Sequence, residues 1–324
     1  MRSNTQLVTA TAALILLAAC TGGRESHPAS SPAPRPSSAL CAVGSGWPGG
    51  IVADTERESD VGSCLEGQPD VVLAWRWASD AVIRAARLHP DTDFVLVDGL
   101  RTTLPNVLTV LFADQQAAFL AGYLAAARSV SHRVGALSSR HPPGPGLLLN
   151  GFAAGVRAYA RETHQPTRLL GWNPSTRQGL VARSAMEAES AAKDLISNGA
   201  DVILADAGSF GSGAARVALA VGHVTLVWTE TDGCRALPRY CVLFLTSVQE
   251  RLGVTLQAVL RREANRSFSG GTYIGTLAND GVALAPFHMH DTEIPIEIRS
   301  RLAQLAGEIA DGSVSVNPSD YVSP

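Results

Sequence analysis

The segment VVLAWRWASDAVIRAARLHPDTDFVLVD, residues 71–98, determines the fold class that the sequence predicts. Residues 71–75 are apolar and predict a buried strand, and residues 93–98 predict a second strand that ends at Gly99. The intervening segment Ser79–Leu88 predicts a helix. Strands rich in Val and Leu that alternate with helices indicate a parallel sheet covered by helices on both faces.

The same alternation continues through the rest of the chain. Further helices are predicted at residues 113–129, 148–162, 180–198, 214–221 and 248–262, and further strands at 133–137, 168–170, 201–205, 224–228 and 242–245. Repeated strand–helix units over this length predict an α/β protein made of two Rossmann-like lobes with parallel sheets.

The amino-terminal segment has the organisation of a bacterial lipoprotein leader followed by a tether. A charged start at Arg2 precedes a mostly apolar run that ends in Leu17-Ala-Ala-Cys20, and this run is too short to span a bilayer as a helix. We therefore expect residues 1–19 to be a signal peptide and Cys20 to carry a lipid that anchors the chain to the extracytoplasmic face of the cell membrane. The alternative is a plain secretory signal with an incidental cysteine. Residues 20–40 are rich in Ser and Pro and predict a semi-extended tether.

Composition and charge exclude several classes of protein. The chain is 46% hydrophobic and has no second run of about twenty apolar residues, so we expect its body to be soluble and globular. Removing Arg2 with the leader changes the formal net charge from −3 to −4, which gives no reason to expect a nucleic acid or an anionic lipid surface as a partner. Lys193 is the only lysine among 26 basic residues, so a binding site that needs a lysine elsewhere cannot have one.

The four cysteines that remain after lipidation are expected to form disulfides. An even number of cysteines in an exported protein favours disulfides over metal binding. Close spacing favours the pairs Cys41–Cys64 and Cys234–Cys241, although the sequence permits three pairings. The histidines lack ligand spacing to these cysteines, and His288-Met-His290 is more typical of an exposed loop than of a zinc site. We expect no metal site and no cofactor.

Several short blocks occur in an order that resembles one protein family. They are Phe94-Val-Leu-Val-Asp98-Gly99, Asn106-Val107, Ala118–Ala126, Arg133-Val-Gly135, Gly151-Phe-Ala-Ala-Gly155-Val156, Asn198–Ile203, Leu245-Thr-Ser247, Asp280-Gly-Val282 and Asp311–Val316. Beside the lipoprotein leader, this order resembles the basic membrane protein (PnrA-like) family of substrate-binding lipoproteins of ABC transporters, over roughly residues 69–317.

The resemblance implies a type I periplasmic-binding-protein fold, with two α/β lobes joined by a hinge. It also implies a small-molecule ligand, for which purine nucleosides are the family's best-known example, and ABC permease subunits as partners. Such proteins close on a ligand and catalyse no reaction. We expect an N-terminal lobe of residues 41–131, completed by about 247–275, and a C-terminal lobe of residues 132–246, completed by about 276–320.

Five residues near predicted strand ends are candidate ligand contacts. Asp98 matches a ligand-contacting aspartate of the nucleoside-binding relatives, with a turn or helix cap as the alternative. Gly208 belongs to a glycine-rich turn whose amides could receive hydroxyls or an anion. Trp172 matches a position where the family often places an aromatic that stacks on the base, with core packing as the alternative. Glu230 and Asp232 match paired aspartates that resemble holders of ribose hydroxyls.

The sequence also departs from the family pattern. The early D-x-S-F-N block, which supplies a second stacking aromatic, is absent, and residues 41–68 are too few for the usual complete β–α–β start, so we expect a truncated N-terminal lobe. Trp77 could replace the missing aromatic, or Arg76 and Trp77 could cover the shortened lobe. The lysine expected after the Thr-Ser block is Glu250. We therefore expect purine nucleosides to bind weakly and the extra carboxylates to favour a cationic or amine-bearing ligand, with Trp172 as a cation–π face.

The sequence thus predicts an extracytoplasmic solute-binding lipoprotein of an ABC importer. Its ligand is expected to be a small polar molecule, for which a nucleoside-like compound is one candidate, held in the cleft between the lobes. The alternative is a divergent surface sensor or interaction lipoprotein without a transport role. Neither a G-x-S-x-G nucleophile motif nor a recognisable triad is present, so the sequence does not indicate an enzyme.

Overall fold

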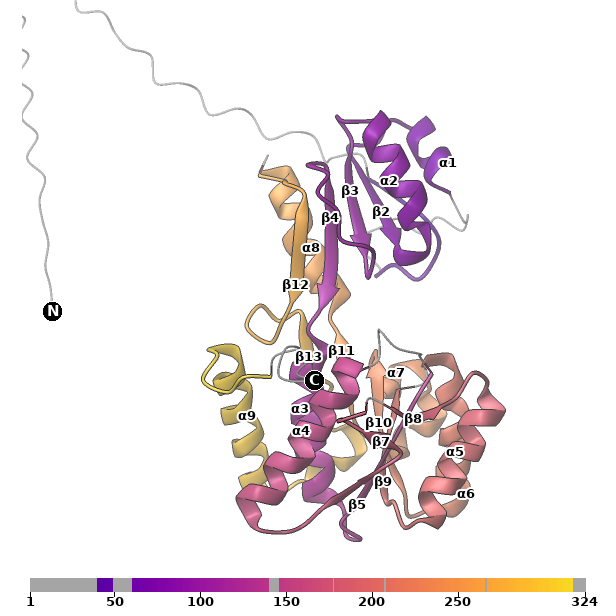
Figure 1. The fold of residues 1–324 in the computed structure, drawn as a ribbon, viewed down its shortest axis with the longest axis vertical. Helices are drawn as coiled ribbons and strands as arrows, with labels where there is room; N and C mark the ends of the chain where they lie inside the picture. The colour runs from indigo at the N-terminus through magenta and orange to yellow at the C-terminus, as the bar shows by residue number, and fades with distance from the viewer. Residues whose placement is uncertain are drawn as a thin grey trace, which may run out of the picture. The chain divides into compact units, whose positions relative to one another are not determined.

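The computed structural model describes residues 40–48, 60–139, 146–176, 178–206, 208–265 and 267–316, all in the unit that begins at Ser37. The leader, Cys20 and nearly all of the expected tether lie outside the described residues. The described chain forms two sheets with helices on both faces of each, as Figure 1 shows. This arrangement confirms the predicted α/β class.

The first sheet has five parallel strands in the order β1-β2-β3-β4-β12. Its strands and the helices packed on it are β1 (Leu40–Ala42), α1 (Val61–Glu66), β2 (Val71–Trp75), η1 (Arg76–Ala78), α2 (Ser79–Leu88), β3 (Asp93–Val97), β4 (Val107–Phe112), α8 (Leu252–Ala264) and β12 (Gly271–Gly275). Alternate strand residues point to opposite faces. Phe94 and Leu96 accordingly pack with α1 and α2, whereas Val95 packs with Leu256 and Val259 of α8.

The first strand–helix–strand unit differs from the sequence prediction. The sequence predicts a truncated start, yet β1, α1 and β2 form a complete unit whose two strands pair in parallel. Its elements are short, because β1 has three residues and α1 has six. The predicted Cys41–Cys64 disulfide is confirmed and joins β1 to α1, while Asp60 caps α1 by accepting from Ser63 N at 2.8 Å. The unit is therefore abbreviated but complete, since a covalent bond and a cap compensate for small packing area.

The second sheet has the strand order β13-β11-β10-β9-β5-β8-β7, with β6 paired to β5. Its strands are β5 (Arg133–Ser138), β6 (Arg168–Leu170), β7 (Trp172–Asn173), β8 (Gln178–Val181), β9 (Val202–Asp206), β10 (Thr225–Glu230), β11 (Phe244–Glu250) and β13 (Val282–Leu284). Strands β5, β9, β10 and β11 pair in parallel, whereas β13 is antiparallel to β11.

Helices cover both faces of this second sheet. They are α3 (Asp114–Arg128), α4 (Gly146–Thr163), α5 (Ala185–Ser197), η2 (Gly208–Gly211), α6 (Ser212–Val221), α7 (Gly233–Ala236), η3 (Pro238–Leu243), η4 (His288–Glu293) and α9 (Ile296–Ala310). Residues of α3, α4 and α9 share one core with the sheet, and residues of α5, α6 and η3 share the other.

Helix α3 belongs to the second sheet because it packs closely on α4. Gly122 of α3 and Gly155 of α4 are the points of closest approach. A Cβ atom at Gly155 would meet the backbone carbonyl of Phe119, and one at Gly122 would meet that of Phe152. Only glycine permits this contact between the two helices.

Three crossovers connect the two sheets, and backbone hydrogen bonds join them. We call them crossover 1 (residues 112–114), crossover 2 (residues 250–252) and crossover 3 (residues 275–282). Ala113 N donates to Gly275 O at 2.8 Å, and Arg251 N donates to Gly281 O at 2.8 Å. The chain therefore changes sheet near residue 113, near residue 250 and between residues 275 and 282, whereas the sequence places these changes near 131, 246 and 275.

Two predicted helices begin later than the sequence indicates. The first turn of the predicted helix at 180–198 is part of β8, because Leu180 pairs with Leu137 of β5. The predicted helix at 248–262 begins only after Glu250, since β11 continues beside β10 to that residue. In both cases a strand formed by long-range pairing replaces a locally favoured helical turn.

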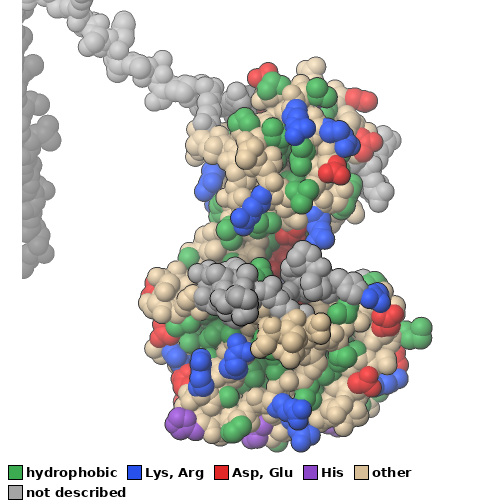
Figure 2. Space-filling model, viewed as in Figure 1, with side chains coloured by type: hydrophobic (Ala, Val, Ile, Leu, Met, Phe, Trp, Pro, Cys, Tyr) green, Lys and Arg blue, Asp and Glu red, His purple; other side chains and the backbone are tan. Residues whose placement is uncertain are grey.

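The surface of the described chain carries charges of both signs. On the face drawn in Figure 2, Lys and Arg side chains are interspersed with Asp and Glu, without a continuous basic area. Among the described helices, none has the length and apolar character needed to cross a membrane.

Candidate functional site

Four acidic residues lie where strands end and crossovers begin. Asp98 directly follows β3, Asp114 is the first residue of α3, and Glu230 and Glu250 are the last residues of β10 and β11. We call these four residues the carboxyl cluster. The carboxyl ends of parallel strands meet at one edge of a sheet, which is where open α/β proteins bind ligands.

Members of the carboxyl cluster are close enough to act on one another. Burial raises the pKa of Glu250 well above its ordinary value, and the charges of Asp114, Asp98 and Glu230 raise that pKa further. Hydrogen bonding with Asp114 acts in the same direction and also raises the pKa of Glu250. A cation placed among these groups would reduce the repulsion that raises the pKa of Glu250.

Two members of the cluster have an unusual backbone conformation. Asp98 has a φ of 53° and Glu230 a φ of 69°, both in the left-handed region. Non-glycine residues adopt this region rarely, and such residues are concentrated at functional sites. At Asp98 the backbone N–H donates to Val110 O at 2.8 Å, which ties the turn to β4. The sharp turn at the end of β3 is thereby fixed.

A cavity of about 720 Å³ includes Glu250 in its wall. Gly46 and Pro48 line it from the segment after β1, and Asp232 lines it from the segment after β10. Arg251 of crossover 2 adds a positive charge to the wall. Residues of β11, of crossover 2, of the start of α8 and of the segments that follow β1 and β10 therefore surround this space.

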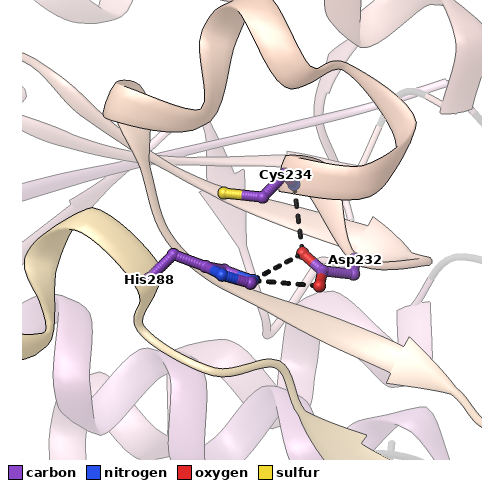
Figure 3. Close-up of side chains that lie close together, drawn as sticks. All are labelled: Asp232, Cys234 and His288. Atoms are coloured by element: carbon purple, nitrogen blue, oxygen red, sulfur yellow. Dashed lines mark hydrogen bonds and ion pairs between the residues drawn. The ribbon is translucent and has the colours of Figure 1, made fainter.

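The side chain of Asp232 is engaged by other protein groups. It is 5% exposed and accepts from Cys234 N at 3.0 Å, which caps α7. As Figure 3 shows, the His288 imidazole faces both carboxylate oxygens, with Nε2 at 3.0 Å from Oδ1 and 2.9 Å from Oδ2. Asp232 thus links α7 to η4, and a ligand would have to compete with these bonds.

Asp232, Cys234 and His288 lie as close together as the ligands of a metal ion, but one of them, as part of a disulfide, cannot bind a metal. Asp232, Cys234 and His288 each offer one ligand atom, and these atoms lie within 4.8 Å of one another. Cys234 is bonded to Cys241, however, which confirms the second predicted disulfide. Metals bind the cysteine thiolate, and a disulfide sulfur does not provide one. The trio is therefore not a metal centre while the disulfide is intact.

Of the six predicted ligand contacts, only Asp232 is among the described residues that line the cavity. Asp98 and Glu230 are not in its wall, and the three remaining predicted contacts lie elsewhere. Trp172 is 7% exposed, packs in the core with α4 and donates from Nε1 to Asn150 Oδ1 at 2.9 Å, which favours the core-packing alternative. Trp77 is 65% exposed, and its ring lies over Gly44, which favours the covering alternative. Gly208 has a φ of 47° in η2, and a Cβ atom there would meet open space.

Asp114 and a buried row of polar residues on the second sheet are not indicated as site residues by the sequence patterns. Asp206 accepts from Ser138 Oγ at 3.1 Å and from Thr229 Oγ1 at 3.2 Å, and all three residues are buried. They come from β9, β5 and β10, so only the strand pairing brings them together. Asp114 had a local signal, because an acidic residue in the first turn suits a helix N-terminus.

The chain belongs to the Bmp family, described as ABC transporter substrate-binding protein PnrA-like, which it matches over residues 54–301. Substrate-binding proteins of ABC transporters are extracytoplasmic, take up a small-molecule ligand and present it to permease subunits. Solute binding, and not catalysis, is the general activity of this family.

Two relatives show the extent of the sequence similarity. The chain is 24% identical to the ABC transporter nucleoside-binding protein BmpA of Lactococcus lactis over 252 residues, which cover 73% of this chain and 68% of that protein. It is 25% identical to basic membrane protein A of Borreliella afzelii over 272 residues, which cover 82% and 77% of the two chains.

Solved structures support the fold. A solute-binding protein of an ABC transporter system from Aeropyrum pernix has a TM-score of 0.63 at 16% identity, covering 79% of this chain and 80% of that one. A solute-binding protein from Conexibacter woesei has a TM-score of 0.60 at 20% identity, covering 78% and 80%. These neighbours establish the type I periplasmic-binding-protein fold for this chain.

Proposed function

We propose that this chain is a solute-binding lipoprotein whose ligand is a small polar molecule carrying a cationic amine. In this proposal Cys20 bears the lipid, the Ser- and Pro-rich segment is the tether, and an ABC permease receives the ligand. The observation that carries the ligand class is the carboxyl cluster, which gathers four acidic side chains at strand ends beside the crossovers.

The chemistry of an ammonium group matches this cluster. An ammonium donates up to three hydrogen bonds, and each bond to a carboxylate is charge-assisted. Such bonds contribute roughly 1.5–3 kcal/mol each. Asp98 directly follows a strand of the first sheet and Glu230 ends a strand of the second, so an amine that contacts both would join the two parts of the chain.

A neutral purine nucleoside finds less support in the same residues. The Lactococcus relative is named for nucleoside binding. In this chain, however, Glu250 occupies the place where the family pattern has a lysine, which removes a donor and adds an acid. Trp172 is packed in the core, and Trp77 is not among the described residues of the cavity wall. We therefore expect adenosine, guanosine and inosine to bind weakly.

The direct test compares two ligands that differ in one group. Adenosine and 5′-amino-5′-deoxyadenosine share base and sugar ring, but only the second carries an ammonium at neutral pH. Calorimetry with the full-length chain in detergent should show at least about tenfold tighter binding of the amine, equivalent to ~1.4 kcal/mol. Glu250→Gln should reduce this preference, whereas Glu297→Gln, a change at an exposed residue of α9, should leave it unchanged.

The test also has outcomes that contradict the proposal. Equal affinity for the two compounds, or submicromolar binding of any of the three neutral nucleosides, would exclude an amine-selective site. If neither compound binds, a thermal-shift screen of polyamines, amino sugars and amino acids against neutral sugars and bases decides the matter, because ligand binding raises the unfolding temperature. Stabilisation by the neutral compounds alone would overturn the assignment.

A further inference from the structure

Three side chains with metal-binding chemistry lie together beside α7 and η4. Asp232 and Cys234 flank Gly233 at the start of α7, and His288 is the first residue of η4, as Figure 3 shows. One ligand atom of each residue lies within 4.8 Å of the other two. The ligands of a tetrahedral zinc ion, with bond lengths of about 2.0–2.3 Å, lie roughly 3.3–3.8 Å apart. Small side-chain movements would therefore bring these three atoms onto one zinc ion.

The two segments that carry these side chains are held by bonds in which no ligand atom takes part. Ser247 of β11 accepts from Gly233 N through Oγ at 2.9 Å. The backbone carbonyl of Ser247 accepts from Ala285 N at 2.8 Å, shortly before His288. One strand residue thus anchors both segments, so their arrangement should survive a change in the bonding of Cys234. A site built on such a frame is pre-organised.

The charges of the three groups match a zinc ion. The Asp232 carboxylate and a Cys234 thiolate together neutralise Zn²⁺, and a neutral His288 imidazole binds the ion through Nε2. Oδ1 of Asp232 accepts from Cys234 N at 3.0 Å, which leaves Oδ2 for the metal. Zinc would then replace the contact of 2.9 Å between Oδ2 and His288 Nε2. Arg235 Nε lies 3.7 Å from Oδ2, but this side chain is 89% exposed and can turn into solvent.

The surroundings of the three groups admit an ion from solvent. The Asp232 side chain is 5% exposed, whereas that of His288 is 28% exposed. Water reaching this side can fill the fourth position of a tetrahedral site with three protein ligands. Thiolate and imidazole ligands suit Zn²⁺, whereas Mg²⁺ and Ca²⁺ prefer oxygen ligands.

The disulfide prevents this binding in the oxidised chain. Cys234 is bonded to Cys241 of η3, and Cys241 is not part of the group of potential ligands. A dithiol opens the bond through a mixed disulfide. It supplies two electrons and two protons, Cys234 and Cys241 become thiols, and the dithiol itself becomes a disulfide. Zinc then replaces the proton on the Cys234 sulfur, and that proton passes to solvent.

We propose that Asp232, Cys234 and His288 form a zinc site that the Cys234–Cys241 disulfide masks and that reduction of this disulfide opens. The oxidised chain binds no zinc at this place, and the reduced chain binds one ion. The zinc site does not depend on which ligand the cavity takes, although Asp232 also lines the cavity.

Two variants that break the same disulfide test the site without a reductant. Cys241→Ser leaves a free thiol at Cys234 and keeps all three ligands, whereas Cys234→Ser frees Cys241 and removes one ligand. Competition with a colorimetric chelator, using the full-length chain in detergent without oxygen, should show one Zn²⁺ per Cys241→Ser chain. We expect its zinc affinity to exceed that of Cys234→Ser by about 100-fold or more, because loss of an outer partner of a metal ligand alone costs about 10–100-fold. Oxidised wild type should bind zinc as weakly as Cys234→Ser.

A pair of histidine variants adds a matched control. In the Cys241→Ser background, His288→Ala should lower the zinc affinity by about tenfold or more. His223→Ala, a change at an exposed histidine beyond the end of α6, should leave it unchanged. Equal zinc affinities of the two cysteine variants, or an affinity that His288→Ala does not alter, would overturn the site.

Reduced wild type keeps the test decisive if the cysteine variants fold poorly. After reduction by a dithiol and its removal without oxygen, added Co²⁺ should give the thiolate charge-transfer absorption of a tetrahedral site. Oxidised wild type should lack this absorption, and His288→Ala should weaken it. Absence of the absorption, or absorption that His288→Ala leaves intact and that therefore comes from other thiols, would overturn the proposal.

Discussion

Glu250 is the one member of the carboxyl cluster among the described residues that line the cavity. It stands at the end of β11, faces three other acids and contributes to the cavity wall. In the family pattern that the sequence resembles, this position carries a lysine. This exchange reverses one charge in the proposed site, so we expect the preferred ligand to differ.

The reverse exchange provides a prediction at this scale. Glu250→Lys should weaken binding of an amine-bearing ligand by about tenfold or more and strengthen binding of neutral nucleosides, because it restores a donor among carboxylates worth roughly 1.5–3 kcal/mol. Calorimetry with 5′-amino-5′-deoxyadenosine and inosine measures both changes. Parallel losses for the two ligands would indicate general damage and would count against a role of Glu250 in selectivity.

Single residues also show how far the sequence predicts the site. Asp98 was found because an apolar run locates the end of a strand, and Glu230 because it matches a paired-aspartate block of the family that the sequence resembles. Asp98 directly follows β3, and Glu230 is the last residue of β10. The two disulfides were found because short spacing limits the pairings. Asp114 was missed because its contact with Glu250 depends on the arrangement of crossovers, which no local pattern reports.

Among the elements, the α3–α4 pair depends on close approach of two backbones. Gly155 of α4 faces the carbonyl of Phe119 and the amide of Tyr123 across the interface. Because backbone atoms cannot move aside as flexible side chains do, even one methyl group should separate the helices. Asp114 is the first residue of α3, so the packing of α3 on α4 helps to set the position of the carboxyl cluster.

Gly155→Ala should therefore lower the free energy of unfolding by about 1–3 kcal/mol through overpacking. Gly307→Ala in α9 is the matched control, because a Cβ atom there meets nothing within 4 Å. The control should raise stability by about 0.5–1 kcal/mol, since alanine is the better helix former. Denaturant unfolding of the two variants checks the prediction. A stabilised Gly155→Ala protein would show that the helices are less closely packed than described.

Element boundaries were predictable where the local signals agreed. Helix α2 spans the residues that the sequence predicts. Helix α5 was placed too early, although Ser184 and Glu187 form a capping pair, with Ser184 Oγ accepting from Glu187 N at 3.2 Å and Glu187 Oε2 accepting from Arg183 N at 2.9 Å. That signal was present in the sequence and marks the true start of the helix.

The whole molecule is expected to stay at the membrane through its lipid. The motif Leu17-Ala-Ala-Cys20 supports this proposal, and these residues lie outside the part of the chain that the structure describes. Cys20→Ser should move the protein from the membrane fraction to the soluble fraction, because one lipidated cysteine supplies the anchor. Fractionation and immunoblotting measure this distribution. A Cys20→Ser protein that stays with the membrane as wild type does would refute the lipid anchor.

The chain returns to complete the first sheet only after most of the second sheet has been made. This order affects how an exported protein of this kind folds as it leaves the translocation channel. Strands β1 to β4 leave the translocation channel early, but α8 and β12, which complete that sheet, follow only after β11. Until then the apolar face of Val95 and Leu108 has no cover from Leu256 and Val259. The second sheet likewise awaits β13 and α9. Neither sheet can therefore finish folding before the other. Each newly exported chain remains incompletely folded, and so exposed to proteases and aggregation, until almost all of it has emerged.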